Sequence, residues 1–179
     1  MKLPERIETE RLLIRPFKLE DFEPYLEFIT DDQATRYLLF NDDQKTVEGA
    51  RELLDFIITS YETDEPVFAC AIALKNDLFI GSCGISAVAE GGVNECYYSL
   101  LPRYWGKGYA SEATEALIRY CFKHLDVSEM RAYIQPGNRQ GIEVAKRVGM
   151  KSDGSAKHPL FGIEASLYTI NRTDGSDSS

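Results

Sequence analysis

The sequence predicts a mixed α/β domain whose central sheet has about seven strands, mostly antiparallel, with helices flanking it. The first observation is the order of the elements, which reads β-α-α-β-β-β-α-β-α-β-β. The second is a run of three strands joined by short turns, which predicts an antiparallel meander. The third is the strand–helix–strand unit that follows, since such a crossover joins parallel strands within one sheet.

The first third of the chain predicts one strand and two amphipathic helices. Residues 11–17 form the strand, which Pro16 interrupts. Residues 20–30 carry apolar side chains three and four positions apart, as on one face of a helix. Thr46 can cap the second helix. The apolar stripe of this helix consists of Val47, Ala50, Leu54, Ile57 and Tyr61.

The meander occupies the middle of the chain. Its strands are predicted at 66–74, 78–88 and 94–101. Residues 75–77 (Lys-Asn-Asp) supply the turn between the first two, and Gly91-Gly92 supplies the turn before the third. The short turns predict that each strand pairs with the next along the chain.

The remaining elements alternate between helix and strand. A helix is predicted over 108–124 and a strand over 130–135. Asn138 opens the next helix, and Gly149 ends it. The last two strands are predicted near 150–156 and at 160–171. This pattern completes one domain.

Length and composition set the limits of that domain and exclude several classes of protein. A chain of 179 residues suits one domain, which we expect over residues 1–171, and we expect the polar tail 172–179 to be disordered. A net charge of −9 argues against nucleic acid as a partner, because phosphate binding needs a basic face. No apolar run approaches the roughly 18–20 residues of a membrane span. No apolar secretory segment opens the chain, so we expect a cytoplasmic protein.

The cysteines and histidines predict no metal site. The four cysteines are Cys70, Cys83, Cys96 and Cys121. None of them forms a C-x-x-C pair, and His124 and His158 stand alone, whereas a zinc site needs clustered ligands. Buried thiols in a reducing compartment are the expected alternative.

The segment with the clearest chemical signal is 101–116, LPRYWGKGYASEATEA, where a strand ends and a helix begins. Gly106 and Gly108 remove side chains from the turn, so that the backbone can approach a ligand. The first N–H groups of a helix have no internal partner and attract anions, and Lys107 adds positive charge. Glu112 lies in the first helical turn and is interpreted as a structural carboxylate. The turn therefore predicts a pyrophosphate site.

Three phosphate-binding patterns can be compared with this turn. The nucleotide P-loop, G-x-x-x-x-G-K-[ST], is absent. The dinucleotide fingerprint G-x-G-x-x-G fails, because residue 111 is Ser and the turn lies past the middle of the chain. Residues 103–108 match a third pattern, R-x-x-G-x-G/A, in full. A nucleotide-binding domain that uses the same glycine turn stays open as an alternative.

The string PRYWGKGYASEA resembles the pyrophosphate loop of the GNAT superfamily of N-acetyltransferases. Two further segments, IETERLLIRPFKLEDF and IQPGNRQGIEVAKRVGM, resemble the branch of ribosomal-protein N-terminal acetyltransferases known as RimJ/RimL-type. The three blocks occur in the family's order and extend across most of the chain. The resemblance implies that acetyl-CoA binds in a V-shaped opening between the strand ending near residue 101 and the strand 130–135.

The resemblance also implies which residues hold acetyl-CoA. Backbone groups of Ser99, Leu100 and Leu101 would pair with the pantetheine arm. Backbone N–H groups of Gly106, Lys107, Gly108, Tyr109 and Ala110 would hold the pyrophosphate. Arg103 would serve the phosphate loop, and Asn138 would contact the CoA arm in addition to capping its helix.

Glu95 is the candidate catalytic base. An amine is protonated at neutral pH and must lose a proton before it attacks a thioester, and a carboxylate can accept that proton, often through water. Relatives in this branch often place Glu at this position of the strand. The resulting oxyanion could be stabilised by a strand N–H near Ser99 or Leu100, after which the CoA thiolate leaves.

The general acid is missing from its usual places. In the family, a tyrosine often lies seven positions after the Asn, and in this branch a serine often lies three positions after it. These positions hold Ala145 and Gly141. Either another tyrosine, such as Tyr97 or Tyr98, donates the proton, or solvent does.

The leading hypothesis is therefore an N-acetyltransferase that acts on a protein N-terminus or a small-molecule amine. The alternative is a non-catalytic acyl-CoA-binding module of the same fold. The loop 31–45 is expected on the acceptor side, and its acidic residues suggest a cationic acceptor, although a solvated loop is the commoner explanation. The resemblance also makes a homodimer plausible.

Overall fold

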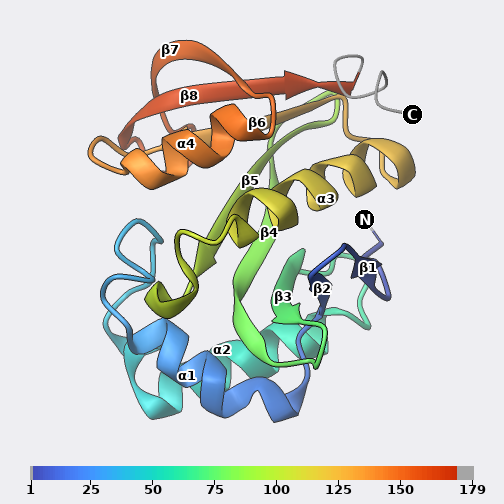
Figure 1. The fold of residues 1–179 in the computed structure, drawn as a ribbon, viewed down its shortest axis with the longest axis vertical. Coiled ribbons are helices and arrows are strands. Elements are labelled where there is room, and N and C mark those ends of the chain that lie inside the picture. The colour runs from blue at the N-terminus through green and yellow to red at the C-terminus, as the bar shows by residue number, and fades with distance from the viewer. Residues whose placement is uncertain (1, 173–179) are drawn as a thin grey trace.

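The computed structural model describes residues 2–172, which form one mixed sheet flanked by helices (Figure 1). The strands are β1 (Ile7–Glu8), β2 (Leu12–Pro16), β3 (Ala69–Leu74), β4 (Phe79–Ala89), β5 (Val93–Leu100), β6 (Glu129–Ile134), β7 (Lys151–Lys157) and β8 (Glu164–Asn171). The α-helices are α1 (Phe22–Thr30), α2 (Val47–Ser60), α3 (Tyr109–His124) and α4 (Arg139–Arg147). Short 3₁₀ turns span Leu19–Asp21, Asp43–Lys45 and Pro102–Tyr104. All but the first residue of the tail predicted at 172–179 lie outside the described residues.

The sheet has the strand order β1-β2-β3-β4-β5-β6-β8-β7. This confirms the mixed, mostly antiparallel architecture and the meander β3-β4-β5. The described residues add one strand to the seven expected, because Ile7–Glu8 pairs with Leu13–Ile14 as a two-residue strand. Too short to show an alternating pattern, β1 gives no signal in the sequence.

Strands β5 and β6 are the one parallel pair among the described strands, and they separate partway along their length. Their pairing covers Val93–Glu95 against Glu129–Arg131 and then stops. Beyond it, β5 stays bonded to β4 as far as Leu100, and β6 stays bonded to β8 as far as Ile134. A V-shaped gap therefore opens after Glu95, as expected. Figure 1 shows α1 and α2 at the opposite end of the molecule from β7 and β8.

Apolar side chains pack on both faces of the sheet. On one face α3 and α4 cover a core that includes the fully buried Leu117 and Met130. On the other, α1 and α2 cover a second core around Phe28 and Leu54. Successive side chains of a strand point to opposite faces, so β5 contributes Cys96, Tyr98 and Leu100 to the first core, whereas Tyr97 packs against the second.

The structure confirms the predicted start of helix α2. The Thr46 hydroxyl accepts a hydrogen bond from Gly49 N over 3.0 Å, which confirms the predicted cap of α2.

All four cysteines are buried and unpaired, and burial raises the pKa of each thiol. Within residues 2–172, every helix is too short or too polar to cross a membrane.

Candidate functional site

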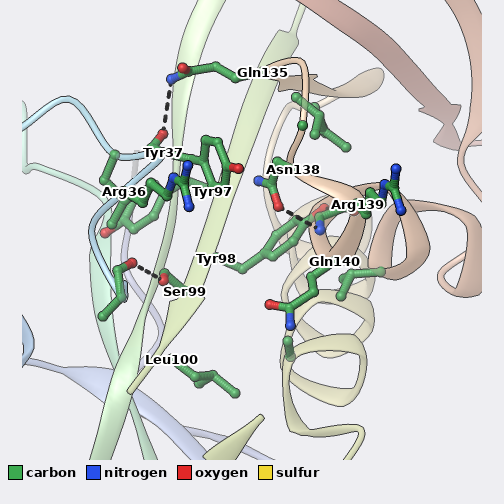
Figure 2. Close-up of a pocket in the computed structure, with 18 of the residues that line it drawn as sticks. Arg36, Tyr37, Tyr97, Tyr98, Ser99, Leu100, Gln135, Asn138, Arg139 and Gln140 are labelled. Carbon is green, nitrogen blue, oxygen red and sulfur yellow. Dashed lines mark hydrogen bonds between the residues drawn. The ribbon is translucent and has the colours of Figure 1, made fainter. Parts of the chain in front are cut away.

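The gap between β5 and β6 opens into a cleft of about 470 Å³. Figure 2 shows Arg36 and Tyr37, from the loop after α1, on one wall, and Asn138, Arg139 and Gln140, at the start of α4, on the other. Side chains of Tyr97, Tyr98, Ser99 and Leu100 line the cleft along β5. The arrangement leaves room for an extended ligand that lies beside β5.

The backbone of β5 directs alternate residues at this gap. Leu101 N donates to Ile80 O over 2.9 Å, so Leu101 is turned toward β4. In an antiparallel pair this orientation alternates, and Ser99 is therefore also turned toward β4, whereas Cys96, Tyr98 and Leu100 face the gap. Leu100 O is taken by the indole N–H of Trp105 at 2.8 Å. Of the three residues predicted to pair with pantetheine, Leu100 directs its backbone at the gap, and Ser99 contributes its side chain to the cleft wall.

The glycine turn leads from this cleft to the start of α3. Gly106 and Gly108 adopt the left-handed backbone, with φ of 73° and 81°, which side chains disfavour. Within the described residues, the amides of 106–111 donate no hydrogen bond, as the first turn of a helix requires. The predicted amides of Gly106, Lys107, Gly108, Tyr109 and Ala110 thus form one unbonded set. Their dipole alignment favours an anion at this point.

A second cleft, of about 290 Å³, adjoins these amides and contains three residues that the sequence reasoning missed. Arg139 and Arg147 line it from α4, and Ser111 lines it from α3. The Ser111 hydroxyl is buried and has no hydrogen-bond partner among the described residues. Two guanidinium groups, an unpartnered hydroxyl and free amides match the donor set that a diphosphate needs. An eight-residue spacing puts both arginines on one face of α4, but which face meets the turn is decided by packing.

Glu112 ties the glycine turn to the first strands. Its carboxylate accepts hydrogen bonds from the Thr9 hydroxyl at 2.6 Å and from Arg11 N at 2.9 Å, and it pairs with Arg11 Nε at 2.6 Å. Arg11 Nη1 also donates to Lys107 O over 2.8 Å. Burial opposes the charge, but these hydrogen bonds hold the pKa of Glu112 below its usual 4.5. Glu112 is structural, as interpreted, and acts by fixing the turn.

We expect Glu112→Gln to lower stability at neutral pH by about 1–2 kcal/mol, because it removes charge-assisted hydrogen bonds. The pKa of Glu112 is lowered in the fold, so its contribution is present above the ordinary value and is lost as pH falls through the lowered one. The difference between parent and variant should therefore shrink below about pH 4. Urea unfolding at pH 7 and at pH 3 measures it, and an equal difference at both values would contradict the assignment.

The side chains of Arg103 and Lys107 lie outside both clefts. Arg103 pairs with Glu27 of α1, with 3.0 Å between Nη2 and Oε2, and this pairing lowers the pKa of the Glu27 carboxyl. Neither Arg103 nor Lys107 lines the two clefts. Both cations lie over the Tyr104 ring. A phosphate-binding role for Arg103 would require it to exchange Glu27 for the ligand.

Glu95 lies at the last paired position before the strands separate. Its side chain shares the face of Tyr97, which lines the cleft. Glu95 Oε2 lies 2.6 Å from His158 Nε2, and Oε1 accepts a hydrogen bond from the Ser86 hydroxyl at 3.0 Å. The His158 ring is 4.8 Å from the ring of Tyr133, a cleft residue. The carboxylate is thus at the closed end of the V, and the histidine that the sequence left without a role is its partner.

The two tyrosines suggested as acids already make other contacts. The Tyr98 hydroxyl donates to Gly141 O at 2.9 Å, and burial raises its pKa. The Tyr97 hydroxyl lies 3.0 Å from the Ser82 hydroxyl, and burial raises its pKa well above the usual value. Tyr133 is different, since its oxygen accepts from Arg131 and its own hydrogen has no acceptor among the described residues.

The cap formed by Asn138 accounts for the glycine at residue 141. The Asn138 side chain caps α4 by accepting from Gly141 N at 2.9 Å. A Cβ at residue 141 would lie 2.7 Å from Asn138 Nδ2. A serine at this position would therefore displace the cap, and Asn138, which lines the cleft, is held as a capping residue.

The loop 31–45 brings positive rather than negative charge to the cleft. Asp31 accepts from the N–H groups of Gln33 and Ala34, and Asp32 pairs with Lys45 at 3.6 Å. The charged side chains that line the larger cleft are Arg36 and Arg139. The expectation of an acidic acceptor wall is not supported, because the charged lining is arginine, and Asp31 and Asp32 bond within their own loop.

A split parallel pair that leads to unbonded amides at a helix start is the arrangement that an extended, diphosphate-containing ligand would fit. The profile of the acetyltransferase (GNAT) domain matches residues 11–151. The uncharacterised N-acetyltransferase p20 of Bacillus licheniformis is 32% identical over 84% of each chain. The Escherichia coli alanine N-acetyltransferase of ribosomal protein uS5 is 32% identical over 46% of this chain and 43% of its own. The structure of a GNAT-family acetyltransferase from Bacillus anthracis is 25% identical, with a TM-score of 0.77 over 94% of this chain and 99% of its own. The chain belongs to the GNAT acetyltransferase family, and the resemblance to its RimJ/RimL-type branch is confirmed.

Proposed function

We propose that this acetyltransferase moves the acetyl group of acetyl-CoA onto a primary amine, either a protein N-terminal α-amine or a small-molecule amine. The observation that carries the proposal is the V between β5 and β6, which ends at the unbonded amides of the glycine turn. Pantetheine pairs with the gap-facing backbone of Tyr98 and Leu100, and the diphosphate binds the amides beside Arg139 and Arg147. The thioester then lies toward the closed end of the V.

The residues at that end carry out the transfer by direct attack. Glu95 accepts the amine proton through water, since Tyr97 and Tyr133, and not Glu95 itself, line the cleft. The neutral amine attacks the thioester carbon, and a gap-facing N–H of β5 stabilises the oxyanion. CoA thiolate leaves, which a thiol pKa of about 8.5 permits without strong acid assistance.

Turnover distinguishes an enzyme from a binding module. Incubation with acetyl-CoA and a panel of amines, including peptides with free α-amines, should release CoA thiol in an amine-dependent manner. The same panel with N-terminally blocked peptides serves as the control. Tight CoA binding without thiol release for any amine would favour the non-catalytic module.

Ligand-induced stabilisation distinguishes CoA from nucleotides. We expect CoA at about 100 times its Kd to stabilise the fold by about 2.7 kcal/mol, and ATP and NAD to leave the unfolding midpoint unchanged. A thermal-shift series with the three ligands measures this. Stabilisation by ATP or NAD alone would support the nucleotide-binding alternative.

Two observations favour a protein N-terminus as the acceptor. The uS5 acetyltransferase of Escherichia coli acts on a ribosomal protein, which makes a protein N-terminus the first acceptor to test. The basic lining from Arg36 argues against strongly cationic small molecules, because like charges repel.

The unpaired, buried cysteines support a reducing compartment, and we propose that the protein works in the cytoplasm.

A further inference from the structure

His158 and Glu95 form a pair that joins the β7–β8 hairpin to the vertex of the V. The distance between His158 Nε2 and Glu95 Oε2 is 2.6 Å. The two side chains are largely buried, with 9% and 18% of their surface exposed. A short contact that is largely shielded from water fixes the relative position of the two groups more firmly than a surface pair would.

The surroundings of the imidazole determine which nitrogen carries the proton. His158 Nδ1 faces the backbone N–H groups of Leu160 at 3.1 Å and Phe161 at 3.3 Å. These groups can only donate, so Nδ1 must accept, and the hydrogen of the neutral ring resides on Nε2. His158 Nε2 therefore donates to Glu95 Oε2.

The imidazole has little freedom to turn away. Its ring centre is 4.8 Å from that of Tyr133 and 4.7 Å from that of Phe161. Its backbone is also held, because His158 N donates to Ile163 O and His158 O accepts from Gly162 N, both at 2.8 Å. The hairpin therefore presents one fixed N–H to the carboxylate.

We propose that His158 is a positioning residue that orients the Glu95 carboxylate toward the acceptor amine. The inference rests on the proposed function, in which Glu95 accepts the amine proton. His158 takes one lone-pair direction of Oε2 and Ser86 takes one of Oε1, which leaves the remaining directions for the water or the amine. A carboxylate without this hydrogen bond would rotate about its side-chain torsions, and the proton transfer would lose its alignment.

Two substitutions and a double-mutant cycle test the inference. His158→Leu removes the donor, and we expect it to lower kcat about 10- to 100-fold while the KM for acetyl-CoA is unchanged. His158→Gln places an amide N–H near the position of Nε2 and should retain most of kcat. In a Glu95→Gln background, His158→Leu should cause little further loss, because both changes act through the same carboxylate. Losses that multiply, or equal losses in the Leu and Gln variants, would show that His158 only ties the hairpin to β5.

A spectroscopic measurement checks the pair without turnover. The chain has two histidines, so His124→Gln isolates the ring nitrogen signals of His158 in ¹⁵N NMR. We expect the Nε2–H tautomer at pH 7, and an Nδ1–H tautomer would overturn the proposal. Failure of the proposed function appears differently, since the parent would then release no thiol with any amine. Failure of Glu95 as the base would appear as a parental rate for Glu95→Gln. A slow Glu95→Gln together with a parental rate for His158→Leu would overturn the inference about His158 alone.

Discussion

Replacing Gly108 with glutamate is expected to abolish CoA binding at concentrations that saturate the parent protein. The residue is the N-cap of α3, and its neighbouring amides are unbonded. A carboxylate at this point repels the diphosphate and competes for the same donors. Loss of two charge-assisted hydrogen bonds, at about 1.5–3 kcal/mol each, lowers affinity by roughly 100-fold or more. Isothermal titration with CoA measures the change.

The control for this variant must carry the same backbone strain. A side chain at Gly108 is disfavoured by its φ of 81°, and its Cβ would approach the flexible end of Arg11 at 3.3 Å. Gly91, in the turn between β4 and β5, has a φ of 75° and open space around its Cβ. We expect Gly91→Glu to bind CoA as the parent does. A folded Gly108→Glu protein with parental affinity would refute the assignment of the site.

Replacing Glu95 with glutamine should lower kcat by about 10²- to 10⁴-fold, the usual contribution of a general base. Glutamine keeps the size of the side chain and can still accept the hydrogen bond from His158, so CoA affinity should be nearly intact. Because the amine must then deprotonate in solvent, the residual rate should rise with pH toward the pKa of the amine, near 8 for an α-amino group. Steady-state kinetics between pH 6 and pH 9 measures both effects.

A carboxylate on the neighbouring strand supplies the matched control. Glu129 of β6 is largely buried like Glu95 and accepts from Arg131 at 2.6 Å, and it lines neither cleft. Glu129→Gln should keep kcat within about twofold of the parent, because this carboxylate lies outside both clefts. Unchanged turnover in Glu95→Gln would remove Glu95 from the mechanism.

Local sequence was sufficient to predict the glycine turn. Gly106, Gly108 and the start of α3 were predicted from a few adjacent residues, because backbone freedom and free helix amides are properties of the local chain. The strands and caps followed for the same reason, as Thr46 illustrates. The missed element, β1, is two residues long and exists because Ile7–Glu8 meets β2.

The remaining parts of the site depend on residues far apart in the chain. Arg139 and Arg147 line the cleft beside the glycine turn only because α4 packs beside α3, and Arg103 is engaged by Glu27 of a distant helix. His158 looked isolated because its partner, Glu95, lies on another strand. Such contacts are set by the order of strands in the sheet, which hydrophobic periodicity does not encode.

The amino-acid pattern alone accounts for the mixed sheet, the crossover and the glycine turn, since each follows from propensities and hydrogen-bonding needs within a short segment. Folding decides the point at which β5 and β6 separate, the side chains that surround the turn, and the partner of Glu95. These features arise when the two cores pack against opposite faces of one sheet, and they therefore belong to the assembled structure.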